Sequence, residues 1–316
     1  MIDITLRKLR YFDALARTGH FGRAAEICAV SQPALSVQIK ELEEMLATPL
    51  FERSPRHLRL TRFGQTFLTR AREILRAVDD LEQLARTSQG RLVGSLRIGV
   101  IPTIAPYLLP RIIQRLSTEY EEAEIHVRET QTSTLIKELK EGRIDMAILA
   151  LPIADPAFAE LALFDERFVL VRPEGEARTP VPSPEKLREM RLLLLEEGHC
   201  FRDQALSFCN LPTGAMGGGR VELREMLDGS SLATLVQMVG AGIGVTLIPE
   251  MAVSVETASA PVSVAHFPDP QPSRTIGMVW RKSSPMGPMF HDIAQTVRDC
   301  AQLGSLPGHE SGATVT

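Results

Sequence analysis

The 316-residue sequence predicts an α/β protein with an all-α N-terminal part. Up to about residue 88 apolar residues recur at helical spacing, whereas beyond residue 95 short strand-like runs alternate with helical segments. The charge changes at the same place. Residues 1–94 hold 15 Lys and Arg against 11 Asp and Glu, which is a net charge of +4. Because the whole chain has a net charge of −4, the remainder has a net charge of −8. A basic module on an acidic body suggests a nucleic-acid-binding domain joined to a second function.

The composition excludes several classes of protein. With 44% hydrophobic and 23% charged residues the chain is neither disordered nor fibrous. No apolar segment of the signal-peptide kind follows Met1 and no run of 18 apolar residues occurs, so we expect a cytoplasmic protein that does not enter a membrane. Four irregularly spaced cysteines make no disulfide framework. We expect no cofactor and no metal site.

The N-terminal part predicts a helix-turn-helix. Its first helix shows an apolar stripe and ends at Gly19; the stripe consists of Leu6, Leu9, Phe12, Leu15 and Ala16. A short second helix, from about Phe21 to Cys28, is followed by a tight turn. Ser31 is then a good N-cap for a third helix, with Pro33 in its first turn. In a helix-turn-helix the second of the two motif helices enters the major groove.

The third helix and the hairpin after it predict the contacts to double-stranded promoter DNA. The hairpin, Leu50–Thr61, is basic and suits a wing that touches the backbone or the minor groove. Side chains able to hydrogen-bond base edges are Gln32, Ser36 and Gln38, and those better placed for phosphates are Ser31, Lys40 and Arg53. Pro33 completes the expected DNA-binding set.

A longer helix is expected from Phe63 to about Ser88. Its apolar stripe suits a helix that pairs with its copy in a dimer, although packing on its own domain is the alternative; the stripe consists of Phe67, Ala71, Ile74, Leu75, Val78, Leu81 and Leu84. The segment Gln89–Gly94 then reads as a hinge. We therefore divide the first part into a DNA-binding domain, 1–62, and a linker with its hinge, 63–94.

The regulatory part, 95–304, predicts strands alternating with helices in mostly parallel sheets. The expected strands are Leu96–Val100, Glu124–Glu129, Met146–Leu151, Phe168–Val171, Leu192–Leu195, Arg220–Leu223, Gly244–Ile248 and Ile276–Trp280. Eight strands over roughly 205 residues fit two small lobes better than one sheet. The last residues, Ser305–Thr316, are expected to be disordered.

The segment Gly198–Cys209 carries the strongest functional signal. It places two of the four cysteines nine positions apart, and His199 and Arg202 beside the first could supply the positive charge that favours a reactive thiolate. If Phe201–Phe208 is helical, the cysteines face opposite sides, about 13–14 Å apart along the axis. A disulfide needs Cα atoms within about 7 Å, so it would require unwinding. The alternative is a pair of inert, buried cysteines.

The chain resembles the LysR-type transcriptional regulators over nearly its whole length. The residues that carry the resemblance are Phe21, Ala24-Ala25, Val30-Ser31-Gln32-Pro33-Ala34-Leu35-Ser36, Ile39, Leu42-Glu43, Leu50-Phe51, Arg53, Thr61 and Gly64. The resemblance implies a winged helix-turn-helix, a linker helix and a two-lobed regulatory domain similar to periplasmic binding proteins. The lobes would be 95–164 with 270–304, and 165–269, joined by crossovers near Phe164–Arg167 and Phe267–Pro272.

Within that family the chain looks most like the branch that senses hydrogen peroxide. The matching residues are Gly99-x-Ile101-Pro102-Thr103, Pro106–Pro110, Glu129-x-Gln131-Thr132, Gly198–Gln204 with Cys209, and Arg274–Gly277. The resemblance implies that Cys200 is the peroxidatic cysteine and Cys209 the resolving one. It implies further that the hydroxyls of Thr103 and Thr132 hold peroxide and that His199 and Arg202 line the pocket. One departure is that Gly214–Arg224 lacks a histidine that the family tends to carry there.

The same resemblance implies a regulator rather than an enzyme. Its expected partners are a second copy in a homodimer or tetramer, RNA polymerase, and a glutaredoxin- or thioredoxin-like reductant. A second hypothesis is a LysR-type regulator that binds a small organic effector between its lobes, near Thr103, Gln131-Thr132 and the Gly240–Gly244 turn. Those glycines also suit a tight helix-to-strand turn, and a threonine at a strand end commonly caps a helix. A free-standing thiol peroxidase is disfavoured by the helix-turn-helix.

Overall fold

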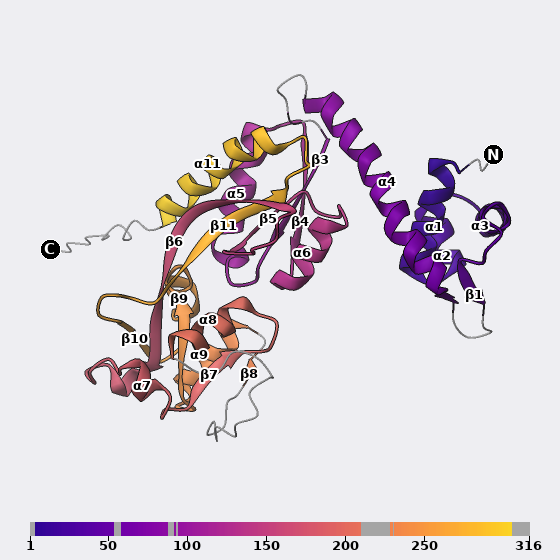
Figure 1. Cartoon of the computed structure of the whole chain (residues 1–316). Coiled ribbons are helices and arrows are strands. Elements are labelled where there is room, and N and C mark those ends of the chain that lie inside the picture. Colours follow the sequence, from indigo (N-terminus) through magenta and orange to yellow (C-terminus); the bar gives the residue numbers. More distant parts are fainter. Residues whose placement is uncertain are drawn as a thin grey trace. The chain divides into compact units, whose positions relative to one another are not determined.

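The computed structural model describes residues 4–53, 58–87, 92, 94–209, 228–229 and 231–304. The chain divides into two compact units, Met1–Gln89 and Gly90–Thr316. Figure 1 labels the elements of both units in chain order. Within the described part, no helix combines the length and the apolar character needed to cross a membrane.

Three short helices build the N-terminal unit: α1 (Leu6–Thr18), α2 (Phe21–Ile27) and α3 (Gln32–Leu46). Helix α1 ends where Gly19 takes a left-handed conformation, with φ of 63°. The hydroxyl of Ser31 accepts the amide of Ala34 at 3.4 Å and so caps α3, as predicted. One apolar core joins the three helices, with Phe12, Leu15 and Leu35 fully buried at its centre.

The predicted wing is a two-stranded antiparallel hairpin of β1 (Phe51–Arg53) and β2 (Leu58–Leu60). Glu43 of α3 fixes its base, since one carboxylate oxygen accepts the amides of Leu50 and Phe51 at 2.8 and 3.1 Å. The tip, residues 54–57, lies outside the described residues.

Helix α4 (Arg62–Thr87) uses its apolar stripe in two ways. In its first half Leu68 and Ala71 are buried, and Phe67 and Leu75 pack partly against the same N-terminal core. Ile74, Leu81 and Leu84 are 48%, 65% and 53% exposed. The alternative of packing on its own domain therefore holds for the first half of α4. The exposed residues keep the pairing of two copies as a prediction for the second half.

The first lobe of the C-terminal unit packs helices on both faces of a sheet. Its strands β3 (Gly94–Val100), β4 (Ala123–Glu129) and β5 (Met146–Ala150) are parallel. The lobe also contains α5 (Ala105–Glu119), α6 (Thr132–Lys140) and α11 (Gly287–Gly304). Gly99 in β3 faces Leu135 of α6, whereas its neighbours Ile98 and Val100 point into the face that α5 and α11 cover.

The second lobe has its own core. Its strands are β7 (Leu192–Leu195), β8 (Asp228–Gly229), β9 (Val245–Pro249) and β10 (Val262–His266). Its helices are α7 (Pro184–Leu187), α8 (Cys200–Phe208), α9 (Leu232–Gly240) and α10 (Val253–Glu256), with short 3₁₀ turns at Glu174–Glu176 and Glu250–Ala252. Strand β7 is buried throughout, which its unbroken leucine run predicts.

Two long strands, β6 (Phe158–Pro173) and β11 (Ser273–Arg281), connect the lobes (Figure 1). The strand order is β4-β3-β5-β11-β6-β9-β7-β8, and β10 pairs with β6. The expectation of mostly parallel sheets was wrong, because β11 is antiparallel to β5 and β6, and β6 is antiparallel to β9 and β10. Strand β6 changes partner at Arg167 and Phe168, from β11 to β9.

Several observed elements differ from the predicted ones. The first half of β6 and the whole of β10 were not predicted, because their apolar residues alternate with polar ones in patterns too short to stand out. The two-residue strand β8 was not predicted either, and the other strands of this unit match to within three residues at each end. The predicted strand Arg220–Leu223 and the predicted disordered tail lie outside the described residues.

Candidate functional site

The candidate site lies where β7 ends and α8 begins. The connecting turn contains Gly198 with φ of 97°, a backbone conformation that favours glycine. A Cβ atom at this position would lie 2.4 Å from the side-chain oxygen of Gln131, the N-cap residue of α6 in the first lobe. The Gln131 amide also donates to the carbonyl oxygen of Glu197 at 3.4 Å. The turn before Cys200 is therefore seated directly on the first lobe.

A small cavity of ≈ 10 Å³ opens beside Cys200. It is lined by Ile101, Pro102, Thr103, Gln131, Thr132, His199, Cys200 and Phe201. About 10–15 Å³ is the room that one buried water occupies on this measure. The cavity is therefore close in size to a single water molecule, and the sequence-predicted residues Thr103, Thr132, His199 and Cys200 all line it.

The two threonine hydroxyls differ in their hydrogen bonds. Thr103 is 3% exposed, and its Oγ1 accepts from Nη1 of Arg274 at 2.8 Å, so it can donate its own hydrogen. Oγ1 of Thr132 is buried and has no hydrogen-bond partner among the described residues. An unpartnered buried hydroxyl costs about 1–3 kcal/mol. The cavity therefore contains a polar group that a ligand could satisfy.

A buried ion pair forms the wall behind Thr103. Nη2 of Arg274 lies 2.6 Å from Oε2 of Glu166, with side-chain exposures of 1% and 4%. Burial raises the pKa of Glu166, and the Arg274 charge opposes this. The Arg274 guanidinium also lies 5.2 Å from the ring centroid of Phe201, the residue after Cys200. Arg274 had no predicted role; its position in the quoted Arg274–Gly277 motif was the only signal in the sequence.

His199 and Arg202 take different positions. His199 lines the cavity and is 7% exposed, and burial lowers its pKa while Glu196 opposes this. The ring is therefore neutral at pH 7, which corrects the prediction that His199 supplies positive charge. Arg202 does not line the cavity; its Nη1 donates to the carbonyl oxygen of Leu195 at 2.8 Å. It supports the turn between β7 and α8.

The two cysteines sit at opposite ends of α8, both as free thiols. Cys200 is half-buried and packs against the core of the first lobe, whereas Cys209 is fully buried in the core of the second. Burial raises the pKa of Cys209 to about 11, and the Arg188 charge opposes this. Cys209 is therefore a neutral thiol at physiological pH.

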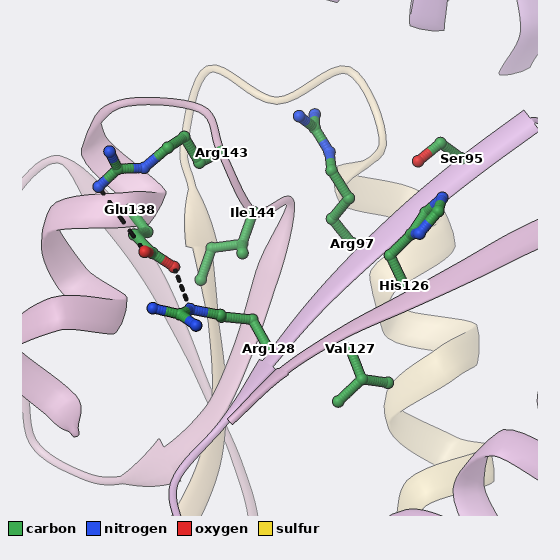
Figure 2. A pocket seen from close by; sticks show the side chains of 8 residues that line it. All are labelled: Ser95, Arg97, His126, Val127, Arg128, Glu138, Arg143 and Ile144. Atoms are coloured by element: carbon green, nitrogen blue, oxygen red, sulfur yellow. Dashed lines mark ion pairs between the residues drawn. The ribbon is translucent and has the colours of Figure 1, made fainter. Parts of the chain in front are cut away.

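A second pocket, of ≈ 380 Å³, lies on the first lobe at β3, β4 and the turn after α6. Figure 2 shows Glu138 between Arg128 and Arg143, at 3.4 and 3.7 Å. Arg97, a third lining arginine, pairs with Asp145 at 2.8 Å. The guanidinium groups of this pocket therefore already face carboxylates. The Gly240–Gly244 turn lines neither pocket; it joins α9 to β9, as its alternative interpretation predicted.

The predicted DNA-contacting residues lie along α3. Ser31, Gln32, Pro33 and Lys40 are exposed, and Ser36 and Gln38 are half-buried. Two are engaged within the helix, since Gln38 donates to Glu41 at 3.0 Å and Lys40 lies 3.5 Å from Glu44. Arg53 ends β1, and its side chain lies outside the described part. Val37, an apolar residue on the polar face of α3, is 52% exposed and was not among the predicted DNA contacts.

Two family models cover both units. Residues 6–65 match the bacterial regulatory helix-turn-helix protein of the lysR family, and residues 89–302 match the LysR substrate binding domain. The chain belongs to the LysR family. The LysR helix-turn-helix is a DNA-binding module, so this chain is a DNA-binding transcriptional regulator of that family.

Similar proteins from this LysR family include peroxide-related regulators. The Escherichia coli K12 "DNA-binding transcriptional dual regulator OxyR" is 40% identical over 298 residues, covering 93% of this chain and 95% of that protein. A full-length OxyR variant from Pseudomonas aeruginosa superposes with a TM-score of 0.76 at 36% identity, covering 95% and 96%. A Corynebacterium glutamicum OxyR mutant with hydrogen peroxide bound superposes with a TM-score of 0.62 at 34% identity, covering 95% of this chain and 93% of that chain.

Proposed function

We propose that this LysR-family regulator responds to hydrogen peroxide through Cys200 and Cys209 and controls oxidative-stress genes. The observation that carries the proposal is the cavity at Cys200, which is about the size of one water molecule and contains the hydroxyl of Thr132, unpartnered among the described residues. The names of the similar proteins support the same ligand. An organic effector would need far more room than this cavity offers.

The chemistry begins with Cys200. Its thiolate attacks one oxygen of hydrogen peroxide, the O–O bond breaks, and a sulfenic acid forms while hydroxide leaves and takes up a proton as water. The hydroxyls of Thr103 and Thr132 hold the peroxide, because each can donate to one oxygen and accept from the other. The neutral His199 adds a ring nitrogen at the same cavity, and Arg274 orients Thr103 from behind.

Cys209 completes the second step. Its thiol condenses with the Cys200 sulfenic acid, so that an S–S bond forms and water leaves. An intact nine-residue helix keeps the two Cα atoms about 13–14 Å apart, well beyond the roughly 7 Å that a disulfide spans. Helix α8 must therefore unwind. Since Cys200 packs on one lobe and Cys209 in the other, oxidation changes the contacts of both lobes.

The remaining expectations complete the proposal. The DNA-binding domain is 1–62 and the linker 63–94; the regulatory lobes are 95–164 with 270–304, and 165–269. Ser31, Gln32, Pro33, Ser36, Gln38, Lys40 and Arg53 contact DNA. The exposed half of α4 supports a homodimer or tetramer. RNA polymerase, a glutaredoxin- or thioredoxin-like reductant and a cytoplasmic location follow from the family. The family histidine missing from Gly214–Arg224 falls outside the described residues.

The test combines disulfide mapping with footprinting of reduced and peroxide-treated protein. Wild type should form a Cys200–Cys209 disulfide at micromolar peroxide and shift its footprint. Cys200→Ser should not respond, and Cys209→Ser should accumulate sulfenic acid and overoxidise. Thr132→Val should slow oxidation by about tenfold or more without lowering stability, because the lost hydroxyl is buried and has no partner among the described residues. A normal response from Cys200→Ser would reject the proposal in favour of an organic effector.

A further inference from the structure

We propose that Arg188 is a positioning residue for the resolving cysteine, holding the C-terminal end of α8 in place while both cysteines are reduced. The inference rests on the proposed function and concerns a residue outside the cavity. It identifies the contact that sets how readily Cys209 leaves the second lobe.

The contact joins two segments of the second lobe. Nε of Arg188 donates to the main-chain carbonyl oxygen of Cys209 at 2.5 Å. Arg188 directly follows α7, and the last residue of that helix, Leu187, is fully buried in the core of the lobe. The hydrogen bond therefore ties an anchored segment to the end of α8.

The position of the acceptor strengthens this hydrogen bond. Cys209 is the C-cap residue of α8, and its amide bonds back to the carbonyl oxygen of Ala205. The last carbonyl groups of a helix have no helical partner and form the negative end of its dipole. A guanidinium donor satisfies one of them and complements that charge. Arg188 is thus a side-chain cap for the end of α8 that carries Cys209.

The Cys200 end of α8 is held by different contacts. Phe201 is 3% exposed and packs edge-to-face on Phe168 with ring centroids 4.8 Å apart. Arg202 donates to the carbonyl oxygen of Leu195 at 2.8 Å, and Gln131 holds Glu197 from the first lobe. Because a disulfide requires α8 to unwind, the C-cap arrangement that presents the Cys209 carbonyl to Arg188 is lost when it forms. Its carbonyl then leaves Arg188, so the hydrogen bond belongs to the reduced state alone.

Removing a contact that exists only in the reduced state must favour the disulfide. The Arg188 side chain is exposed, so its hydrogen bond changes an equilibrium constant by up to about tenfold once screening by solvent is allowed for. For a two-electron couple, tenfold corresponds to about 30 mV. Arg188→Ala should therefore make the reduction potential of the Cys200–Cys209 couple more negative by up to about that amount.

The experiment equilibrates the full-length protein with mixtures of reduced and oxidised glutathione. Disulfide formation consumes one oxidised glutathione and releases two reduced ones; acid quenching, alkylation and mass spectrometry then give the disulfide fraction. The matched control is Lys186→Ala, which removes the same charge two residues earlier, where Lys186 pairs with the exposed Glu189 at 2.6 Å. We expect a shift of about three- to tenfold for Arg188→Ala and a shift below about twofold for Lys186→Ala.

The outcomes separate this inference from the proposed function. A wild type that forms no Cys200–Cys209 disulfide contradicts the proposed function itself. A wild type that forms it, with Arg188→Ala within twofold of wild type or shifted toward the thiols, overturns the role of Arg188. If Arg188 merely stabilised the lobe, its loss would weaken both redox states equally and leave the potential unmoved. A shift equal to that of Lys186→Ala would assign the effect to overall charge and overturn the positioning role.

Discussion

Gly198→Ala tests whether the seating of the Cys200 turn on the first lobe matters for the chemistry. Two features of Gly198 resist a methyl group. Its φ of 97° lies in the region that side chains avoid, and the new Cβ would lie 2.4 Å from the side-chain oxygen of Gln131. Gln131 precedes Thr132, whose hydroxyl faces the cavity. The substitution therefore pushes apart the two sides of the peroxide site.

The two effects can be separated in magnitude. Backbone strain at such a φ costs about 1–3 kcal/mol. Losing the hydrogen bond from Gln131 to Glu197 adds about 1 kcal/mol, so the total is about 2–4 kcal/mol. Gly242 is the matched control, because its φ is also positive, at 77°, and a Cβ there meets nothing within 4 Å. Gly242→Ala should show the strain without the clash.

The assay measures the second-order rate of Cys200 oxidation by peroxide in stopped flow, beside unfolding in guanidinium chloride. We expect Gly198→Ala to lose about 10- to 100-fold in rate, as displacements near 1 Å commonly do. Gly242→Ala should lose stability but no rate. Adding Gln131→Ala to Gly198→Ala removes the clashing atoms and should recover part of the rate. Equal rates for wild type and Gly198→Ala would refute the argument that this contact positions Cys200.

Three further predictions concern titration, accessibility and DNA. Because burial lowers the pKa of His199, protonation of its ring favours the unfolded chain. The regulatory unit should therefore lose stability as the pH falls below about 6.5, by at most about 1.4 kcal/mol per pH unit. In denaturant titrations, His199→Asn should flatten that dependence on pH. In the reduced protein at pH 8, iodoacetamide should alkylate Cys200 well before Cys209, whose thiol is buried and has a pKa of about 11; equal labelling rates would contradict its burial. Arg53→Ala should weaken binding to every DNA sequence and lower the salt slope by about one unit, and a sequence-dependent loss would instead assign Arg53 to base reading.

The elements that local chemistry determines could be predicted from the sequence. Ser31 and Gly19 mark helix ends because a side-chain cap and a left-handed glycine act within a few residues. The unbroken leucine run of β7 predicts a strand that is buried on both faces. The direction of β11 could not be predicted, since pairing with both β5 and β6 depends on a long-range arrangement. The first half of β6 could not be predicted either, since its pairing with β11 is also long-range and one side of the strand is exposed.

The candidate site divides along the same line. His199, Cys200 and Cys209 are close in sequence, so their spacing on one helix was readable. The side chains that orient them come from elsewhere: Arg274 from β11, and Gln131 from the start of α6. The charge of His199 also depended on the fold, because the sequence suggested that His199 supplies positive charge to Cys200, whereas burial lowers the pKa of its ring. Local sequence thus predicts which groups react, and tertiary packing decides their charge.

The division of the two cysteines between two cores gives the switch its order of events. Cys209 has no access to peroxide while it is buried as a neutral thiol, so it does not compete with Cys200 for the oxidant. Condensation must then break α8, withdraw Cys209 from its core and separate Phe208 from Phe267, whose rings lie 5.0 Å apart. Each of these contacts stabilises the reduced state, and an aromatic pair alone contributes about 0.5–1.5 kcal/mol beyond its burial. The covalent S–S bond offsets their loss. Once a reductant cleaves that bond, the same contacts favour the return of α8, so the fold itself supplies the reset.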